Sequence, residues 1–485
     1  MNAFDYFFEN TFDSEKLFLV GKEETSFKQL YNNCISLANN LNQKIGKDQK
    51  ILLLSENNKF CITSYLAIIK SGNICIPLDP GIEKENFEYI RGITHPSLIF
   101  VTPVVNKRLS VTEPVIMPDD VLSYEPSKLN FTVDKDFGEN RLAEIIFTSG
   151  STGVPKGVMI SHKNLISNTR SILEYLKLKP SDRMLVVLPF YYCFGLSLLH
   201  THLRAGGSIV LNNSFMFIGN VIQNLLEYSC TGFAGVPSHF QILLRKTKTF
   251  KETKFPDLRY VTQAGGKLPA VFIDEFREAF PNTKFIVMYG QTEATARLAY
   301  LPPEMYNKKK GSLGKAIPGV ELRIINEKGK EAQPGETGEI IARGDNIMLG
   351  YYNDETTTRE TLRNGWLYTR DIANMDEDGY IFMIGRSKEF IKIRGKRISP
   401  KEIEEVILRL PEVIDCTIEK LEDESFGEAL KATVITSGNI EPEEYKKALL
   451  KHCSEHLALF KVPQVIDISK QLVISPTGKK IKKNQ

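Results

Sequence analysis

Short apolar runs that alternate with helix-like segments are the feature that most constrains the fold of this 485-residue chain. Ile51–Ser55 predicts a buried strand, Phe60–Lys70 a helix, and Ile74–Leu78 the next strand. The same rhythm predicts further strands at Leu98–Val101, Leu185–Leu188, Ser208–Leu211, Gly232–Gly235 and Phe285–Tyr289. Strands that alternate with helices in this way indicate parallel α/β layers.

The pattern changes at about Gly311, where short strands punctuated by Gly, Asp and Asn begin. These strands are predicted at Val320–Asn326, Gly338–Arg343, Tyr368–Met375 and Gly379–Ile384, and they indicate a smaller β-rich subdomain. A further unit follows, with helices predicted at Pro400–Leu410 (N-cap Ser399) and Glu441–Leu457 and strands at Ala429–Thr436 and Val465–Ile468.

We place the main boundary near Lys388. The predicted fold is α/β. A large N-terminal domain, residues 1–387, combines layered α/β subdomains with the β-rich subdomain. A small α+β domain, residues 388–485, completes the chain.

Composition and charge exclude several classes of protein. The 62 basic and 59 acidic residues leave a net charge of +3, so a nucleic-acid partner is not expected. The seven cysteines are odd in number and form no C-x-x-C pair, which argues against a disulfide framework or zinc site and for a reducing compartment. The first ten residues lack a basic signal-peptide start. The longest apolar stretch, Leu185–Leu199, is interrupted by Pro189 and Gly195, so no transmembrane segment is expected. These features predict a cytoplasmic protein.

The segment Ile145–Gly157, IIFTSGSTGVPKG, is the sharpest chemical signal in the sequence. An apolar strand leads into a loop that combines hydroxyls, glycines and one cation: Thr148, Ser149, Gly150, Ser151, Thr152, Gly153 and Lys156. Glycines let backbone N–H groups approach an oxyanion, and the hydroxyls and the lysine add donors and charge. The loop therefore predicts a polyphosphate site. It is not a P-loop, because Gly157 and not Ser or Thr follows the lysine. The alternative is a Ser/Gly-rich surface turn.

Thr148–Gly157 resembles the phosphate-binding signature of the AMP-forming adenylating enzymes, which comprise acyl- and aryl-CoA synthetases, adenylation domains of peptide synthetases, and firefly luciferase. Further segments resemble other motifs of this superfamily, in its order: Ser71–Pro80, Tyr289–Glu293 (YGQTE), Gly365–Asp371 (GWLYTRD), Gly385–Glu404 and Pro476–Lys480 (PTGKK). A single match is weak evidence, but an ordered set over nearly the whole chain is specific.

The resemblance implies roles in ATP and Mg²⁺ binding for the YGQTE motif. Tyr289 would place its ring against adenine, and Gly290 would belong to the same nucleotide-binding motif. Thr292 would contact phosphate, and Glu293 would bind Mg²⁺. Thr292 and Glu293 would both take part in catalysis. The alternative for Tyr289 is a core aromatic at a strand end.

Three further segments are implied to complete the nucleotide site. Gly265-Gly266 would form a flat wall beside adenine and the acyl group, Asp371 would accept hydrogen bonds from the ribose, and Arg386 would be a second nucleotide contact. The alternatives are a plain turn for the glycines, a turn residue for Asp371, and a surface ion pair for Arg386. Trp366, the only tryptophan, is expected to pack.

Lys479 is the predicted catalytic lysine, because it follows Thr477-Gly478 as the lysine of the superfamily follows a Ser-Gly or Thr-Gly pair. Its ammonium would stabilise the negative charge that builds up when a carboxylate attacks the α-phosphate. Lys480 is the alternative, one position off the pattern. The remaining C-terminal lysines are expected to be solvated.

The resemblance also implies two half-reactions and a mobile C-terminal domain. The first makes acyl-AMP and pyrophosphate; in the second a thiol of CoA or of phosphopantetheine takes the acyl group. Lys388 matches the hinge, and Gly395 the glycine that lets pantetheine pass. Arg394 and Lys396 either contact CoA phosphates or belong to a solvated turn.

The acyl pocket is less well defined by the sequence. Tyr192 stands where CoA-forming relatives often have a His, so that His cannot guide the choice of acid. No acidic residue occurs from Pro189 to Gly207, which argues against an α-amino acid. Val236, Pro237, Phe240 and Gly265 are expected to line the pocket or, alternatively, to be ordinary core residues.

The sequence therefore predicts an ATP-dependent, AMP-forming acid–thiol ligase that acts on a small-molecule carboxylic acid and CoA. The alternatives are transfer to an acyl or peptidyl carrier protein, a luciferase-like adenylating oxygenase, and a non-catalytic nucleotide-binding homologue. The presence of Lys156, Glu293, Asp371 and Lys479 argues against the last of these.

Overall fold

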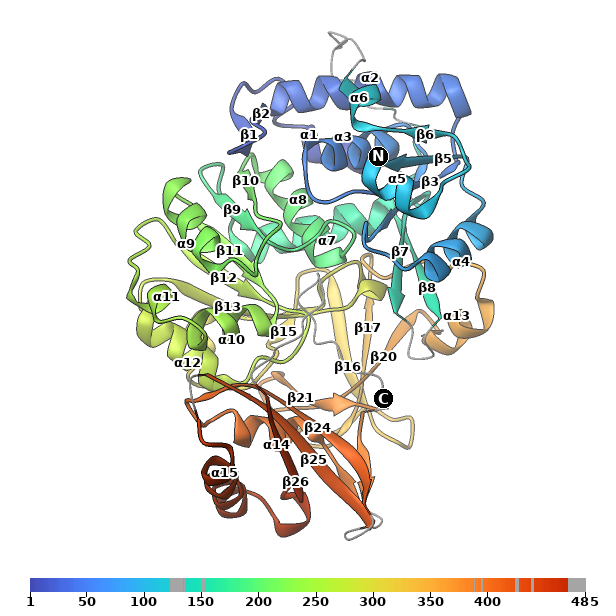
Figure 1. Ribbon diagram of the computed structural model, residues 1–485. Helices are drawn as coiled ribbons and strands as arrows, with labels where there is room; N and C mark the ends of the chain where they lie inside the picture. The colour runs from blue at the N-terminus through green and yellow to red at the C-terminus, as the bar shows by residue number, and fades with distance from the viewer. Residues whose placement is uncertain are drawn as a thin grey trace.

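The computed structural model describes residues 1–122, 134, 136–149, 154–387, 389–393, 396–423, 427–437 and 440–469. Figure 1 shows a large N-terminal part in blue to green, a β-rich part in yellow below it, and a smaller C-terminal part in orange to red at the bottom. The predicted α/β class, with a large first unit and a small last one, is confirmed.

Two largely parallel sheets form the N-terminal part. The nine-stranded sheet has the order β15 (Lys315–Ala316), β14 (Ala299–Leu301), β13 (Lys284–Tyr289), β12 (Tyr260–Gln263), β11 (Gly232–Gly235), β9 (Arg183–Val186), β10 (Ser208–Leu211), β1 (Leu17–Val20), β2 (Thr25–Ser26). The seven-stranded sheet has the order β18 (Gly350–Tyr351), β8 (Pro155–Ser161), β7 (Leu142–Ser149), β4 (Ile74–Leu78), β3 (Lys50–Leu54), β5 (Leu98–Val101), β6 (Val115–Ile116).

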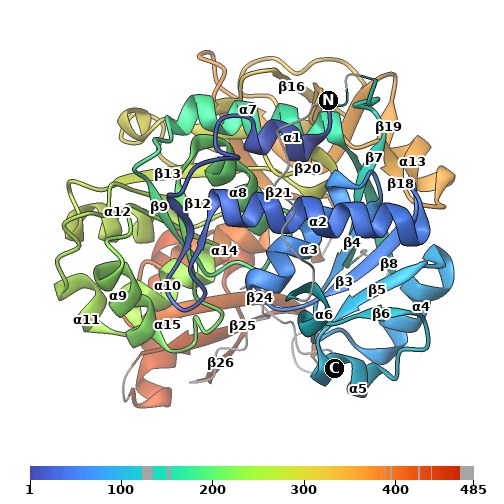
Figure 2. The same ribbon diagram turned by 90° about the horizontal axis from the view of Figure 1, so that it is seen from above.

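Helices fill the space between the two sheets, as the view from above shows (Figure 2). These central helices are α1 (Ala3–Phe8), α2 (Phe27–Ile45), α3 (Lys59–Lys70), α7 (His162–Leu176) and α8 (Cys193–Ala205). Capping boxes at Ser26 and Ser161 define where α2 and α7 begin. Their apolar faces join both sheets in one large core.

The outer helices cover the far faces of the two sheets (Figure 2). Beside the seven-stranded sheet lie α4 (Lys84–Thr94) and α5 (Pro103–Leu109), whereas α6 (Pro118–Leu122) packs against α3 on the inner side. Beside the nine-stranded sheet lie α9 (Ile218–Glu227), α10 (Pro237–Arg245), α11 (Lys248–Glu252) and α12 (Ala270–Ala279). Among the described residues, no helix has the length and apolarity needed to cross a membrane. All seven cysteines are described, and none forms a disulfide.

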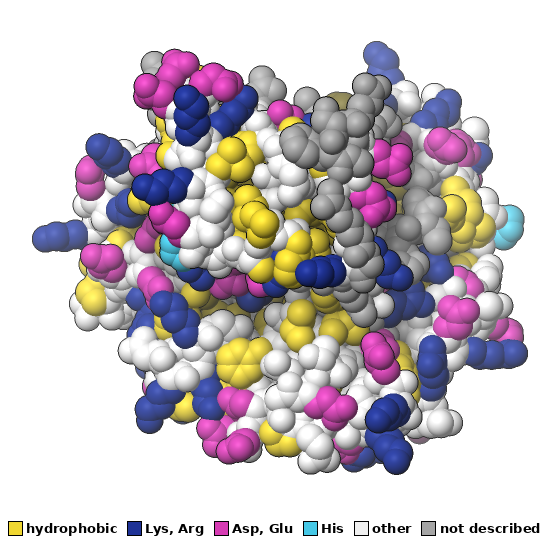
Figure 3. Space-filling view, turned by 90° about the horizontal axis from the view of Figure 1, so that it is seen from below, with side chains coloured by type: hydrophobic (Ala, Val, Ile, Leu, Met, Phe, Trp, Pro, Cys, Tyr) yellow, Lys and Arg dark blue, Asp and Glu magenta, His cyan; other side chains and the backbone are white. Residues whose placement is uncertain are grey.

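The β-rich part is a five-stranded antiparallel sheet, close to the subdomain that the sequence predicts. Its strands are β16 (Val320–Ile325), β17 (Gly338–Gly344), β20 (Trp366–Met375), β19 (Leu362–Arg363) and β21 (Ile381–Arg386), and helix α13 (Glu355–Thr361) precedes β19. The guanidinium groups of Arg323 and Arg343 lie 4.8 Å and 4.7 Å from the Trp366 ring, so this ring packs as expected. Basic and acidic side chains are interspersed on the face seen from below (Figure 3).

The C-terminal part begins with a hairpin of β22 (Ile391–Ile393) and β23 (Lys396–Ile398). A three-stranded sheet of β24 (Val413–Asp423), β25 (Gly427–Thr436) and β26 (Val465–Ser469) follows, with α14 (Pro400–Ile407) and α15 (Pro442–His456) beside it. Ser399 occupies the N-cap of α14, but its hydroxyl donates to the carbonyl of Ile384 and makes no capping bond.

Arg245, at the end of α10, joins the N-terminal part to the C-terminal part. Its Nη1 donates to the carbonyl oxygens of Leu408 and Leu410, both at 2.9 Å, and to that of Val413. Its other nitrogens bind the carboxylate of Glu275 in the N-terminal part. The Arg245 side chain is only 3% exposed, so these bonds are shielded from water.

Candidate functional site

Three residues of the predicted nucleotide site meet beside the C-terminal end of β13. The hydroxyl of Tyr289 donates to Asp371 Oδ2 at 2.6 Å, and Arg386 Nε donates to Asp371 Oδ1 at 2.9 Å. Tyr289 ends β13, whereas Asp371 and Arg386 are opposite one another on β20 and β21. The fold therefore brings together residues from three motifs, of which Tyr289 and Asp371 are 82 positions apart.

Burial dominates the electrostatics of this group. It raises the pKa of Asp371 above the usual value for an aspartate, against the opposing charge of Arg386. The Arg386 side chain is 54% exposed, so the buried carboxylate has a charged partner that reaches the surface. The carboxylate can accept hydrogen bonds from a nucleotide sugar, and the aromatic ring of Tyr289 offers a surface for a base.

The residues predicted to bind phosphate and metal form a second group. Glu293 Oε1 accepts a hydrogen bond of 2.7 Å from the Tyr351 hydroxyl. The Tyr351 ring also lies 5.6 Å from Lys156 Nζ, which donates to Thr357 at 2.7 Å and pairs with Asp354 at 3.2 Å. Tyr351 thus connects the predicted metal ligand with the predicted phosphate lysine.

The predicted phosphate loop joins two antiparallel strands. Thr148 and Ser149 end β7, and Lys156 lies on β8, where it pairs with Thr148. The Thr148 hydroxyl donates to the Lys156 carbonyl at 3.5 Å. The described strands on either side of the loop therefore pair with each other up to Ser149 and Pro155. Gly150, Ser151, Thr152 and Gly153 lie outside the described residues.

The three residues predicted to bind the acyl group are in contact. A Cβ added to Gly265, where φ is +83°, would lie 3.0 Å from both the Tyr192 hydroxyl and Val236 Cγ1. One added to Gly266 would lie 3.2 Å from Pro237. A side chain at either glycine would therefore press against these neighbours, and the role of Gly265-Gly266 as a wall of the ligand site stays a prediction.

Gly290 lies where a side chain has no room. A Cβ at this position would lie 2.0 Å from the carbonyl oxygen of Ala296. The backbone turn that carries Thr292 and Glu293 depends on this close approach.

We expect Gly290→Ala to lower the free energy of unfolding by about 1–3 kcal/mol, because the overpacked turn must shift. Nucleotide affinity should fall with it, since Tyr289 and Thr292 flank the displaced backbone. Thermal unfolding and ATP titration would measure both effects. Gly92→Ala is the matched control, because a Cβ on Gly92 meets nothing within 4 Å. Equal behaviour of the two variants would show that the turn tolerates a side chain.

Several predicted residues lie outside the described part of the chain. These are the catalytic lysine Lys479 with its alternative Lys480, the hinge Lys388, and Gly395 of the thiol passage. Their roles stay predictions.

The sequence did not predict that Tyr351, Asp354 and Cys193 contact the candidate site. Tyr351 is 58 positions from its partner Glu293, and no local pattern signals that contact. Cys193 begins α8, and its Sγ lies 3.5 Å from the hydroxyl of Thr292. The fold alone places this thiol beside the predicted phosphate contact.

The two-part chain and the meeting of Tyr289, Asp371 and Arg386 are what the sequence predicts for a nucleotide-binding enzyme. Comparison with known proteins agrees with this prediction. The chain matches the AMP-binding enzyme model over residues 8–352 and the model of the AMP-binding enzyme C-terminal domain over residues 402–479. The chain belongs to the AMP-binding enzyme family.

The individual relatives are CoA ligases. The oxalate–CoA ligase of Arabidopsis thaliana is 30% identical, with 96% of this chain and 94% of that protein covered. The 2-succinylbenzoate–CoA ligase of Bacillus mycoides is 28% identical, with 92% and 90% covered. The solved structure of the anthranilate CoA ligase AuaEII in complex with anthranoyl-AMP is 25% identical, covers 99% of this chain and 95% of its own, and has a TM-score of 0.90. These findings confirm the predicted class, an ATP-dependent, AMP-forming ligase that joins a carboxylic acid to CoA.

Proposed function

We propose that this protein activates a carboxylic acid with MgATP as an acyl-adenylate and transfers the acyl group to CoA at the site described above. The observation that supports this proposal best is the convergence of Tyr289, Asp371 and Arg386. They come from separate motifs, yet they form one hydrogen-bonded group.

In this proposal, adenine lies against Tyr289 and the wall of Gly265-Gly266. The ribose hydroxyls donate to Asp371, whose oxygens also accept from Tyr289 and Arg386. A carboxylate oxygen has more than one acceptor lobe, so these bonds leave capacity for the ribose. The phosphates lie along the β7–β8 turn and Thr292. Lys156 would then exchange its bonds to Asp354 and Thr357 for phosphate oxygens.

Mg²⁺ fits this site as a partner of the nucleotide. Mg²⁺ prefers oxygen ligands and is commonly held by one or two carboxylates together with phosphates and water. Glu293 supplies one carboxylate, oriented by Tyr351. No cluster of three or more metal-ligating side chains occurs in the described parts of the chain, so the nucleotide would provide most other ligands. Bound Mg²⁺ would neutralise charge on the phosphates.

The first step forms a bond from a substrate carboxylate oxygen to the α-phosphorus and breaks the bond to the β-phosphate, so pyrophosphate leaves. In the second step the CoA thiolate attacks the acyl carbon and AMP leaves. Lys479 stabilises the charge of the first step. Gly395 and Lys388 serve the passage of the thiol and the rotation of residues 388–485.

Arg245 provides a test of that rotation. We expect Arg245→Met to change the ratio of the two half-reaction rates by at least about tenfold, since a single charged hydrogen bond contributes roughly 1.5–3 kcal/mol. Arg245 holds residues 388–485 in the orientation seen in this structure. The half-reaction that uses this orientation should slow in the variant, and the other half-reaction should not. Pyrophosphate exchange and single-turnover thioester formation measure the two steps separately.

The matched control for Arg245→Met is Lys267→Met. Lys267 also crosses between the two parts, through an ion pair with Glu405 at 3.2 Å, but both side chains are partly exposed. Such a pair contributes little, so we expect less than about a twofold change. A parallel loss of both half-reactions in Arg245→Met would contradict an orienting role.

Transfer to the phosphopantetheine of a carrier protein is the alternative for the second step, with the same adenylation. The relatives' names specify CoA, and they name different acids: oxalate, 2-succinylbenzoate and anthranilate. They leave the acid of this chain open. The cytoplasmic location stays a prediction.

ATP–pyrophosphate exchange with purified protein, Mg²⁺ and a panel of fatty, aryl, short-chain and amino acids tests the proposal. Exchange that depends on one class of acid supports adenylation, and CoA or a loaded carrier protein added next identifies the acceptor. If no acid supports exchange while ATP still binds, the protein is a binder and not a ligase.

A further inference from the structure

Lys156, the predicted phosphate lysine, is held by two partners in this structure. Its Nζ lies 3.2 Å from Asp354 Oδ2 and donates to the Thr357 hydroxyl at 2.7 Å. The side chains of Lys156 and Asp354 are 25% and 32% exposed, so the ion pair is partly shielded from water. The phosphates of the proposed nucleotide and the carboxylate of Asp354 would therefore bind the same ammonium group.

The backbone just before Asp354 is fixed against β8, the strand that carries the phosphate lysine. Tyr351 of β18 pairs with Val158 of β8, and the N–H of Tyr352 donates to the carbonyl of Gly157 at 2.7 Å. Strand pairing therefore keeps the carboxylate within reach of the ammonium.

The charge of Asp354 is not needed to begin helix α13. Asp354 is the N-cap of this helix, and its Oδ1 accepts a hydrogen bond of 3.0 Å from the N–H of Thr357. Asparagine and serine cap helices about as well as aspartate does. Hydrogen bonds from Thr357 hold the pKa of Asp354 below its usual value, and Lys156 lowers this pKa further, so the carboxylate is ionised at neutral pH. Asp354 therefore offers Lys156 a full negative charge beyond what capping requires.

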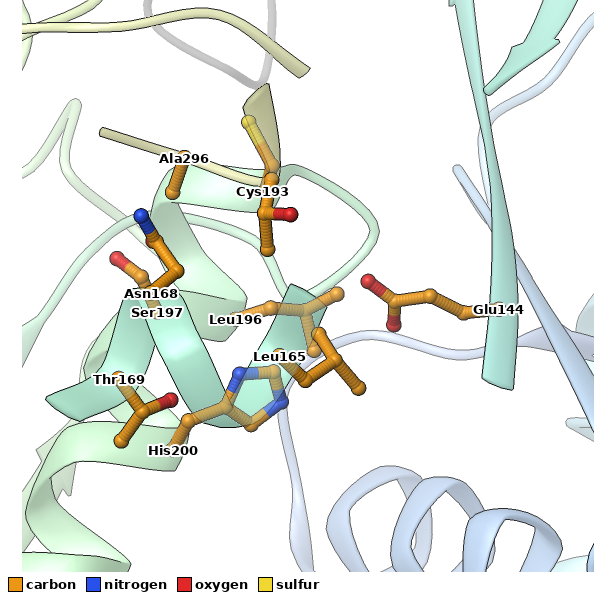
Figure 4. A pocket seen from close by; sticks show the side chains of 10 residues that line it. Glu144, Leu165, Asn168, Thr169, Cys193, Leu196, Ser197, His200 and Ala296 are labelled. Carbon is orange, nitrogen blue, oxygen red and sulfur yellow. The ribbon is translucent and has the colours of Figure 1, made fainter. Parts of the chain in front are cut away.

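The cavity beside Thr292 is too small to hold pyrophosphate. Cys193, whose Sγ lies 3.5 Å from the Thr292 hydroxyl, lines this cavity, and Figure 4 shows Glu144 from β7 and Ser197 from α8 around it. The cavity has room for about one water molecule. Pyrophosphate at the proposed site therefore lies outside this cavity, and Lys156 is the charged side chain that β8 offers it.

We propose that Asp354 is a positioning residue that competes with the nucleotide phosphates for Lys156 and so speeds the release of pyrophosphate. This inference rests on the proposed ligase function. When ATP binds, its phosphates displace the Asp354 carboxylate from Lys156, which weakens ATP binding. Once pyrophosphate has formed, the carboxylate competes for the ammonium again, and the product leaves faster. The group of Tyr289, Asp371 and Arg386 is held by its own hydrogen bonds, so this competition leaves the base and sugar contacts in place.

The test measures binding directly and needs no acid substrate. Three ligands are titrated into the full-length protein by calorimetry in the presence of Mg²⁺: pyrophosphate, AMP, and an ATP analogue with a methylene group between the α- and β-phosphates. Asp354→Asn keeps the helix cap but removes the charge, so we expect pyrophosphate and the ATP analogue to bind about three- to tenfold more tightly. AMP, which lacks the β- and γ-phosphates, should bind as it does to the unaltered protein.

Glu355→Gln is the matched control for Asp354→Asn. Glu355 is the first residue of α13; it pairs with Arg359 at 2.8 Å, and 84% of its side chain is exposed. Removing this neighbouring charge should leave all three affinities unchanged. In a Lys156→Met background, Asp354→Asn should lose most of its effect, because the competition acts through the ammonium.

The outcomes separate this inference from the proposed function. Unchanged or weaker binding of pyrophosphate to a folded Asp354→Asn protein overturns the inference, and so does an equal gain in Glu355→Gln. If neither AMP nor the ATP analogue binds to the unaltered protein, the proposed function and the inference are both overturned. If Asp354→Asn does not fold, Asp354→Ser provides the same test, because serine also caps a helix without adding charge.

Discussion

Lowering the pH from 7 to 5 is expected to reduce the free energy of unfolding by about 6 kcal/mol, because four buried histidines cost more than Glu144 returns. Burial lowers the pKa of His162, His200 and His239 to about 3 and that of His202 to about 4. In the unfolded chain each titrates near 6.5. Protons therefore bind the unfolded state first, and stability falls as the pH drops below 6.5. Each histidine costs about 2 kcal/mol by pH 5.

Glu144 opposes this loss. Burial raises the pKa of its carboxyl to about 7, so in the native state it takes up a proton well above the pH at which the unfolded chain does. Its contribution increases by about 2 kcal/mol as the pH falls from 7 to 5. Glu144 accepts a hydrogen bond from Tyr65, which also contacts His200, so these two groups titrate in one buried cluster.

Urea unfolding at a series of pH values gives the free energy of unfolding at each pH. The slope of that free energy against pH gives the number of protons taken up on unfolding. His239→Phe is an informative control. The His239 ring packs at a tilt against Phe215 with centroids 4.0 Å apart, and its Nδ1 has no partner among the described residues. Phenylalanine keeps this ring contact, so the variant should unfold with about one proton fewer taken up below pH 6. Stability that is flat from pH 7 to 5 would contradict the assignment of neutral histidines.

Most of the central parallel strands of the two large sheets could be predicted because their residues are buried on both faces. Continuous apolar runs such as Ile74–Leu78 and Leu98–Val101 match β4 and β5 at both ends. β24 (Val413–Asp423) was missed, since charged and polar residues alternate with its apolar ones and its pairing with β25 forms only in the folded domain. The antiparallel partner of β7 was also beyond prediction, because nothing local distinguishes a hairpin turn from a loop that leads to a helix.

Site residues that belong to a short sequence motif could be predicted. Site residues that are brought together only by the fold could not. Tyr289, Asp371 and Arg386 were named from short sequence patterns, and they do meet. The contact of Asp354 with Lys156 depends on the pairing of β18 with β8. Long-range packing of this kind leaves no periodic signal in the sequence.

Lys479→Ala should lower the rate of acyl-adenylate formation by roughly a thousandfold while ATP binding changes little. A lysine directed at the α-phosphate acts on charge that develops only in the transition state, and removing one such donor typically costs about 10²–10³ in rate. The loss should therefore appear in kcat of pyrophosphate exchange and not in the affinity for ATP. Thioester formation from acyl-adenylate supplied directly should survive, because the proposed rotation of residues 388–485 would carry Lys479 away from the phosphate before that step.

Lys480→Ala and Lys482→Ala are matched controls for Lys479→Ala, since each removes the same charge from the same basic segment. If the Thr477-Gly478 pair sets the register, both controls should retain most of the activity. A large loss in Lys480→Ala with an active Lys479→Ala would move the catalytic role by one position. Equal, modest losses in all three variants would mean that the segment acts only through its summed charge, and no single lysine would then be catalytic.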